Sequence, residues 1–237
     1  VVVAVEDEVQ DSRARPQSAR VVRMAGTTAR ARRDVDAIRV HSAAMKRLVF
    51  LLLAFSSCSI VKAARVRDDW AQGDRQAVRR LAVVVQPLPD GNPKAGEAFA
   101  RIARRYVNQK RDFLVKKEVV QAEAPKLADL CGGEDAIEGV LFLKPAFKPE
   151  GSGFEAELSG ALARCPDGRE AWTGQAAGSF PSKDPGLVEV TTIYVQEFGP
   201  EVERYVPPAL NLLRPLLDTL PQPILTEADV DEKLTLD

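Results

Sequence analysis

Strands and helices alternate in the pattern of hydrophobic and polar residues that begins at position 81. The continuous apolar run over residues 81–85 contains three valines and predicts a strand that is buried on both faces of a sheet. Asn92 then supplies a helix N-cap, and Pro93 occupies the first helical position. Apolar residues recur at helical spacing as far as about Asn108, opposite a face rich in arginine. Residues 113–120 return to a strand pattern.

The second half of the pattern contains mainly strands and then helices. A short helix is predicted from Pro125 to the double glycine at 132–133, and the apolar run over 139–147 predicts a third strand. Strict alternation over 154–162 predicts a strand with one exposed face. The sequence Pro166-Asp167-Gly168 is typical of a hairpin turn. The remaining predicted elements are a fifth strand and two proline-divided helices, at about 170–180, 187–198 and 209–220.

This order of elements, β-α-β-α-β-β-β-α, predicts an α/β fold, more narrowly an α+β sandwich in which helices pack on a mixed sheet. We expect a single domain over 81–221. Residues 58–80 are polar and charged and predict a tether, in which Trp70 docks on the domain. Residues 222–237 predict an acidic tail, with one short helix after Thr226 and otherwise mobile.

Residues 45–57 have the pattern of a bacterial export signal. Two cations, Lys46 and Arg47, precede an uncharged and almost wholly apolar run from Leu48 to Phe55. A membrane-spanning helix needs roughly 20 apolar residues, so this run is too short to span a bilayer. Ser56-Ser57-Cys58 follows directly and is similar to a lipobox, whose cysteine takes a diacylglyceryl group before cleavage.

Three interpretations of Cys58 remain open. If the lipobox is used, acyl chains on Cys58 anchor the protein to a membrane, and Ser59 after the cysteine favours the outer membrane. If ordinary signal peptidase cuts at Val61-Lys62-Ala63 instead, Cys58 is discarded with the leader. In the third interpretation, Cys58 is a buried thiol. We expect residues 1–44, upstream of the leader, to be either translated from a start codon placed too early or disordered. A basic arm is the alternative.

Charge and histidine content exclude several functions for the exported part. The chain has 33 basic and 34 acidic residues. The 180 residues from Cys58 onward contain 23 of the basic and 28 of the acidic residues, so this part carries about five net negative charges. A nucleic-acid partner is therefore not expected. The only histidine, His41, lies before the leader, so the exported part has no imidazole for a catalytic triad or a histidine metal site. We expect no metal and no cofactor.

Cys131 and Cys165 are the two other cysteines. An even number in an oxidising compartment predicts a disulfide. Bridging them would close a loop of about 35 residues and stabilise the fold by roughly 3 to 4 kcal/mol on the chain-entropy model. Two separate reduced thiols are the alternative, and a catalytic cysteine is the least expected because no base accompanies either residue.

The strand from Arg80, the loop Pro89-Asp90-Gly91 and the segment from Ile102 to Lys116 carry a family resemblance. They resemble a lipoprotein family of myxobacteria and spirochaetes to which no activity is assigned. More broadly, the order of elements and Ile137-Glu138-Gly139 resemble the TolB N-terminal domain. The small domains of the CsgG lipoprotein and of penicillin-binding-protein activator lipoproteins are similar. The resemblance implies a scaffold that binds other envelope proteins or forms a homo-oligomer, although fold alone does not transfer a role.

The leading hypothesis is therefore a non-enzymatic binding or assembly module on the periplasmic face of the outer membrane. The predicted basic helix face, Arg101, Arg104 and Arg105, is a candidate contact for anionic glycan or lipid headgroups, and a solvated helix face is the alternative.

A hydrolase or small-ligand-binding protein is the competing hypothesis. Glu134 and Asp135 beside the double glycine are its candidate carboxylates, and acids in this position usually just keep a loop soluble. The loop at 89–92 offers an anion site at a helix N-terminus, without any glycine-rich phosphate motif.

Overall fold

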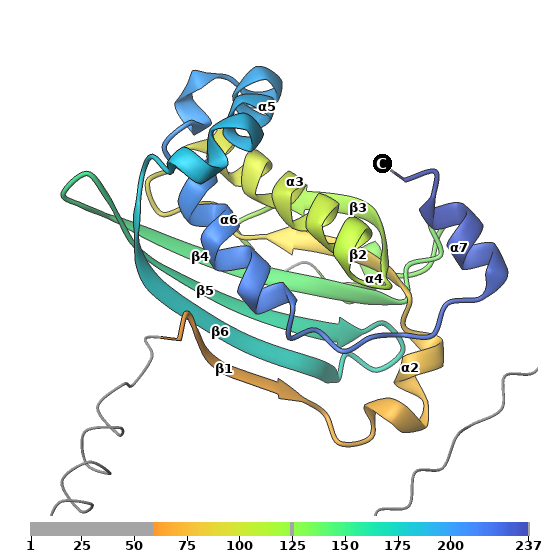
Figure 1. The fold of residues 1–237 in the computed structure, drawn as a ribbon. Coiled ribbons are helices and arrows are strands. Elements are labelled where there is room, and N and C mark those ends of the chain that lie inside the picture. Colours follow the sequence, from red (N-terminus) through yellow and green to blue (C-terminus); the bar gives the residue numbers. More distant parts are fainter. Residues whose placement is uncertain (1–58, 124–125, 237) are drawn as a thin grey trace, which may run out of the picture. The chain divides into compact units, whose positions relative to one another are not determined.

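The computed structural model describes residues 59–123 and 126–236, which contain one mixed sheet of six strands with helices packed on it (Figure 1). The predicted α/β fold class is confirmed. Residues 1–58, with the predicted leader and Cys58, lie outside the described residues. The strands are β1 (Val61–Val66), β2 (Arg80–Val85), β3 (Leu114–Val120), β4 (Gly139–Glu150), β5 (Gly153–Arg164) and β6 (Glu170–Pro181).

The strand order across the sheet is β1-β6-β5-β4-β2-β3. β2 lies between β3 and β4 and is parallel to both, whereas β4, β5, β6 and β1 pair antiparallel in turn. Parallel neighbours need a crossover connection, which a helix supplies between β2 and β3. The helices are α2 (Asp74–Ala77), α3 (Pro93–Lys110), α4 (Leu127–Leu130), α5 (Val188–Phe198), α6 (Val206–Leu217) and α7 (Glu227–Lys233). Short 3-10 turns are η1 (Trp70–Gln72), η2 (Pro185–Leu187) and η3 (Pro200–Val202).

Local sequence explains the predicted helix α3. The Asn92 side chain accepts a hydrogen bond from the Ala95 amide at 3.2 Å, and Pro93 fills the first helical position. Its apolar face, including Phe99 and Ile102, is buried against the sheet and α6. In the part of the chain that the structure describes, no helix has the length and apolarity that a bilayer crossing requires.

Trp172 on β6 is the largest fully buried side chain among the described residues, and two glycines make room for it. Its ring lies against Gly160 and Gly174, which pair across β5 and β6. A Cβ atom on Gly174 would stand 2.6 Å from Trp172 Cζ2 and 2.7 Å from Leu216 Cδ1. The indole Nε1 donates to Thr219 Oγ1 at 3.1 Å, so the one polar atom of the ring is satisfied. Side chains at these two glycine positions would displace the ring.

The predicted tether is wrong for residues 59–80, because they are part of the folded domain. β1 pairs with β6 and forms one edge of the sheet. Trp70 is only 6% exposed, as its expected docking requires, and its ring centroid lies 6.4 Å from that of Phe113. Asp74 is also buried and accepts hydrogen bonds from Arg67 and Arg164. The domain therefore begins well before position 81.

Residues 222–236 of the predicted acidic tail dock on the domain, in contrast to the predicted mobile segment. The short helix expected after Thr226 is confirmed as α7. Asp229, in its first turn, is only 1% exposed. Its carboxylate accepts from Arg79 Nη1 at 2.8 Å and pairs with Arg80 Nη2 at 2.5 Å. Because both arginines stand at the start of β2, these contacts fasten the tail to the central strand.

Candidate functional site

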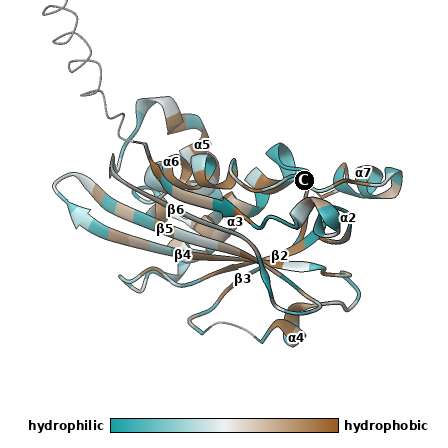
Figure 2. Cartoon of the chain, turned by 90° about the horizontal axis from the view of Figure 1, so that it is seen from below, coloured by the Kyte–Doolittle hydropathy of each residue, from teal (hydrophilic) through white to brown (hydrophobic). Residues whose placement is uncertain are grey.

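The helices leave much of one sheet face uncovered. α3 and α6 pack on one side, where they share the main hydrophobic core with the sheet. On the other side a small cluster joins Leu130 of α4 to Val84 and Val140. Hydrophilic and hydrophobic residues alternate along β4 and β5 toward their hairpin (Figure 2), which is typical of an antiparallel sheet with one solvated face.

Strand register aligns the residues of this open face in two rows that cross the sheet. Directly opposite residues point to the same face, so each row follows from the pairing alone. The rows are about 7 Å apart, since residues on one face recur every second position. The first row is Val84, Phe142, Ala161, Thr173 and Arg65. The second row is Lys144, Ser159, Gln175 and Ala63, and Gln86 follows β2 beside it.

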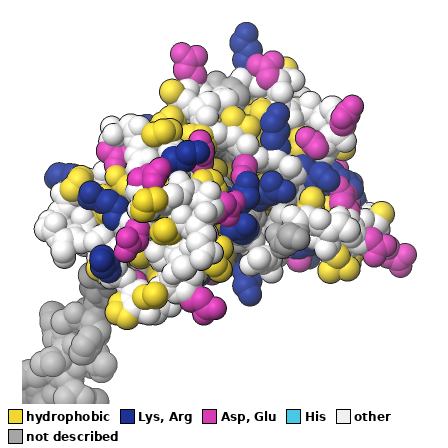
Figure 3. Space-filling model, turned by 90° about the horizontal axis from the view of Figure 1, so that it is seen from above, with side chains coloured by type: hydrophobic (Ala, Val, Ile, Leu, Met, Phe, Trp, Pro, Cys, Tyr) yellow, Lys and Arg dark blue, Asp and Glu magenta, His cyan; other side chains and the backbone are white. Residues whose placement is uncertain are grey.

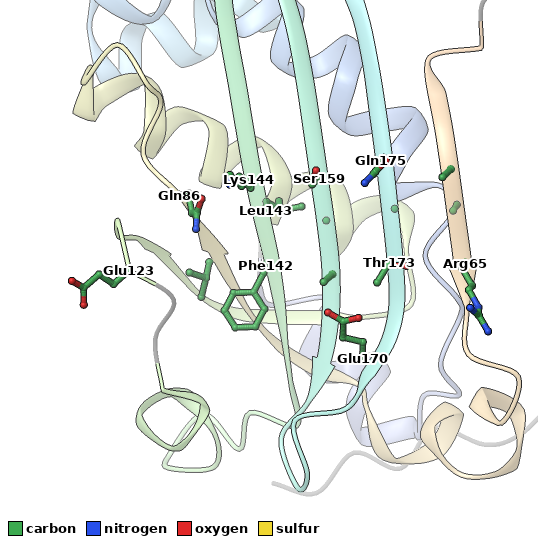
Figure 4. A pocket seen from close by; sticks show the side chains of 16 residues that line it. Arg65, Gln86, Glu123, Phe142, Leu143, Lys144, Ser159, Glu170, Thr173 and Gln175 are labelled. Carbon is green, nitrogen blue, oxygen red and sulfur yellow. The ribbon is translucent and has the colours of Figure 1, made fainter.

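The two rows line a hollow of about 440 Å³ (Figure 4). The Phe142 ring lies on its floor and is partly buried against the cluster around Val84. Ala161, the small residue between Phe142 and Thr173 in the first row, leaves space above the sheet. The sequence produces this surface because β4, β5 and β6 place most of their large apolar residues on the helix side and, apart from Phe142, small or polar residues on the other.

Polar side chains around the hollow have no partners among the described residues. The neutral ones, Gln86, Ser159, Thr173 and Gln175, make no side-chain hydrogen bond within residues 59–123 and 126–236. The charged ones, Arg65, Glu123, Lys144 and Glu170, make no ion pair in the same part of the chain. Buried carboxylates elsewhere, such as Asp74 and Asp229, are each held by two arginines. The hollow therefore offers donors and acceptors that the domain itself does not use.

The three arginines of α3 do not form a free basic face. Arg101 Nε donates to Glu118 at 2.6 Å and its Nη1 donates to Glu197 at 2.5 Å. Arg105 pairs with Glu197 at 2.9 Å and Arg104 lies 3.9 Å from Glu118. Positive and negative side chains are correspondingly interspersed on the helix side of the molecule (Figure 3). The expected anionic contact would thus have to compete with two glutamates.

Arg105 also contacts the ring of Tyr194 on α5, with its guanidinium carbon 5.3 Å from the ring centroid. Burial raises the pKa of Tyr194 above its ordinary value, although Arg105 acts in the opposite direction. These contacts hold α5 against α3. The arginine side chains therefore join two helices, which sequence periodicity alone did not indicate.

Cys131 and Cys165 lie together at the end of α4 and at the turn between β5 and β6. The structure joins them, with Cα atoms 5.6 Å apart and an S–S distance of 2.13 Å. The bridge ties the α4 segment to the rim of the sheet beside the small cluster. Cys58, the predicted lipidation site, lies outside the described residues.

The candidate carboxylates of the competing hydrolase hypothesis are not gathered into a site. Glu134 and Asp135 are exposed on a loop after Gly132 and Gly133, and they do not line the hollow of the open sheet face. Over residues 59–123 and 126–236, no three His, Cys, Asp or Glu side chains are arranged to hold a metal ion.

The loop at 89–92 is used by the fold itself. Asp90 accepts a hydrogen bond from the Tyr205 hydroxyl and another, at 3.2 Å, from the Asn92 amide. Asn92 in turn caps α3. The predicted anion site at this helix N-terminus is thus occupied by side chains of the domain.

The hollow was not found by sequence reasoning. The only signal was the alternation along 154–162 and 170–180, which places polar residues on one face but does not say what lies opposite them. The β1 side of the hollow, with Ala63 and Arg65, falls in the segment that was predicted to be a tether.

Fold and site together define an α/β protein with one open, polar sheet face. No family model matches the chain, and no curated protein matches it. Solved structures give distant likenesses. The PelC dodecamer from Paraburkholderia phytofirmans is 17% identical with a TM-score of 0.40, and the match covers 63% of this chain and 91% of PelC.

The lipoprotein GNA1162 from Neisseria meningitidis is 15% identical with a TM-score of 0.35, over 50% of this chain and 96% of that one. A Xanthomonas campestris protein, XCC0632, is 12% identical with a TM-score of 0.27, over 63% and 93% of the two chains. None of these likenesses assigns a function to this chain.

Proposed function

We propose that this protein is a lipid-anchored protein on the periplasmic face of the outer membrane that acts as a non-enzymatic binding or assembly module. The short leader and the Ser56-Ser57-Cys58 motif support the anchor. The pairing of Cys131 with Cys165 supports an oxidising compartment, because disulfides persist there and are rare in the cytosol.

The observation that carries the binding role is the unpartnered polar surface of the hollow. The charged side chains around the buried Asp74 and Asp229 are paired with one another. Those of the open sheet face have no partner within the described residues. A binding site with a partly apolar floor and a few convergent polar groups is the usual form of a ligand site.

The placement of the two acidic residues near the hollow favours a binding role over a catalytic one. Glu123 follows β3 and Glu170 begins β6, so they come from different elements, and both are exposed. The chain's only histidine, His41, lies outside the described residues. The lining of the hollow supplies no imidazole as a general base.

Metabolic labelling with an alkynyl fatty acid tests the anchor. The wild-type protein should take up label and sediment with outer membranes, and Cys58→Ala should lose both properties. A double variant, Cys131→Ala with Cys165→Ala, serves as the control and should keep the label. Label retained by Cys58→Ala, or a wild-type protein without label, would refute the anchor.

A photo-crosslinking residue at Gln175 tests the binding role in whole cells, with Gln196 on the exposed side of α5 as the matched position. Envelope components should crosslink at Gln175 and not at Gln196. Equal or absent crosslinking at the two positions would refute the use of the open face. Self-association is a further part of the proposal, and light scattering of the purified protein measures it.

A further inference from the structure

The floor of the hollow presents an aromatic ring to a ligand. Phe142 lies between Val84 on β2 and Ala161 on β5 in the first row, and it is partly buried against the small cluster of Val84, Leu130 and Val140. This packing fixes the ring in place, while the neighbouring alanine leaves it accessible from the hollow (Figure 4). A fixed and accessible ring is suited to stacking against a flat apolar surface.

The polar groups around the ring are mostly neutral and can both donate and accept. Gln86 and Gln175 carry amides, and Ser159 and Thr173 carry hydroxyls. Hydroxyl groups of a sugar likewise donate and accept, whereas a phosphate only accepts and an ammonium only donates. The neutral part of the lining therefore matches a polyhydroxyl ligand better than an ionic one.

Charges on the rim balance one another. Arg65 and Lys144 are basic, and Glu123 and Glu170 are acidic. Strong attraction of a charged surface, such as an anionic bilayer or a nucleic acid, needs an excess of one sign. The balanced rim instead favours a ligand that is neutral overall.

The shape of the site favours a chain over a compact molecule. The first row crosses five strands, from Val84 on β2 to Arg65 on β1, and four strand spacings give it a length of about 19 Å. An extended peptide is the competing occupant. It would need partners for its backbone amides, and the face of a sheet supplies side chains instead of the backbone groups available at an edge.

We propose that the open sheet face binds a neutral glycan, with one sugar ring stacked on Phe142 and its hydroxyls bonded to Gln175, Thr173, Ser159 and Gln86. This inference rests on the proposed binding role and names the class of its ligand. At the efficiency usual for small ligands, a single ring of about twelve non-hydrogen atoms binds with a dissociation constant on the order of millimolar. Several rings along the row bind more tightly.

Isothermal titration of the full chain with tetramers of N-acetylglucosamine and of glucose tests this. At least one tetramer should bind, and Phe142→Ala should weaken binding about five- to tenfold. Because Phe142 also packs on the small cluster, Gln175→Ala provides a second variant on the exposed surface, with several-fold weakening expected. Gln196→Ala, an exposed glutamine without a side-chain partner in the described part of the chain, is the matched control and should bind as wild type.

Failure of both tetramers to bind would overturn the proposal. So would binding that Phe142→Ala and Gln175→Ala leave unchanged, or displacement from the hollow by a neutral extended peptide or by phosphatidylglycerol vesicles. Fatty-acid labelling of Cys58 is measured separately. Labelled protein that does not bind glycan would therefore refute only the glycan inference. Unlabelled protein that binds glycan would refute only the proposed lipid anchor.

Discussion

Replacing Asp229 by asparagine is expected to loosen the C-terminal tail from the sheet. The buried carboxylate pairs with Arg79 and Arg80, and it caps its own helix by accepting from the Thr226 amide at 2.9 Å. Breaking a buried ion pair by removing one partner typically costs 3 to 5 kcal/mol; because both arginines keep some exposure to water, we expect about 3 kcal/mol here. Asp231→Asn, an exposed acid on the same helix, is the matched control.

Urea unfolding measures the global effect, and hydrogen exchange of the α7 amides measures local detachment, since a terminal helix can open before the rest of the domain. Asp229→Asn should lower the unfolding free energy or speed the α7 exchange, whereas Asp231→Asn should change neither by more than about 0.5 kcal/mol. If the two variants behave alike in both assays, the tail is not held by this contact.

The same pair of variants gives a dependence on pH. Burial of Asp229 opposes its ionisation, but hydrogen bonds from Thr226 and the charges of Arg80 and Arg79 outweigh this and lower its pKa. A lowered carboxyl pKa contributes stability that is present above the ordinary value of about 3.9 and is lost as pH falls through the folded-state value. Asp229→Asn should therefore lose less stability on acidification than Asp231→Asn.

Three other changes are expected to have measurable effects. Replacing Cys131 and Cys165 together by alanine should lower the unfolding free energy by about 3 to 4 kcal/mol, and dithiothreitol should destabilise only the wild type; equal midpoints would contradict the bridge. Gly174→Ala should cost about 2 kcal/mol through collision with the buried indole. Gly73→Ala, with nothing within 4 Å of the added carbon, should change stability by about 1 kcal/mol or less, and similar losses for both glycines would contradict the close packing. Burial and a hydrogen bond to the Asp218 carboxylate raise the pKa of Tyr106 to about 12. The contribution of Tyr106 to stability is therefore complete below the ordinary tyrosine pKa of about 10 and is lost as pH rises through about 12. Ultraviolet titration of the wild type against Tyr106→Phe measures this pKa, and a transition near 10 would contradict the shift.

Elements with a strong local signal were predictable from the sequence. The β2 strand is a continuous apolar run, and α3 begins at an Asn92 cap whose hydrogen bond the structure contains. β5 shows its one-sided burial as alternation along the chain. In each case the pattern within about ten residues decided the structure.

Elements whose burial depends on distant partners were not predictable. β1 is an edge strand with nearly all of its side chains exposed, so its composition resembles that of a tether. Its pairing with β6 joins residues more than 100 positions apart. The docking of α7 depends on Arg79 and Asp229, which are 150 positions apart. The hollow depends on the register of five strands, and periodicity cannot give register.

The position of β1 also connects the two parts of the proposed function. The Ile60 carbonyl accepts from the Ala177 amide at 2.9 Å, so the chain is already fixed to the sheet at that point. Ala63, at the β1 end of the second row, is five residues from Cys58, and the chain between them spans at most about 18 Å. A lipid on Cys58 would therefore hold the hollow close to the bilayer without a long tether. Its ligand would have to lie within reach of the membrane surface, which favours a glycan strand beside the membrane over a partner deep in the periplasm.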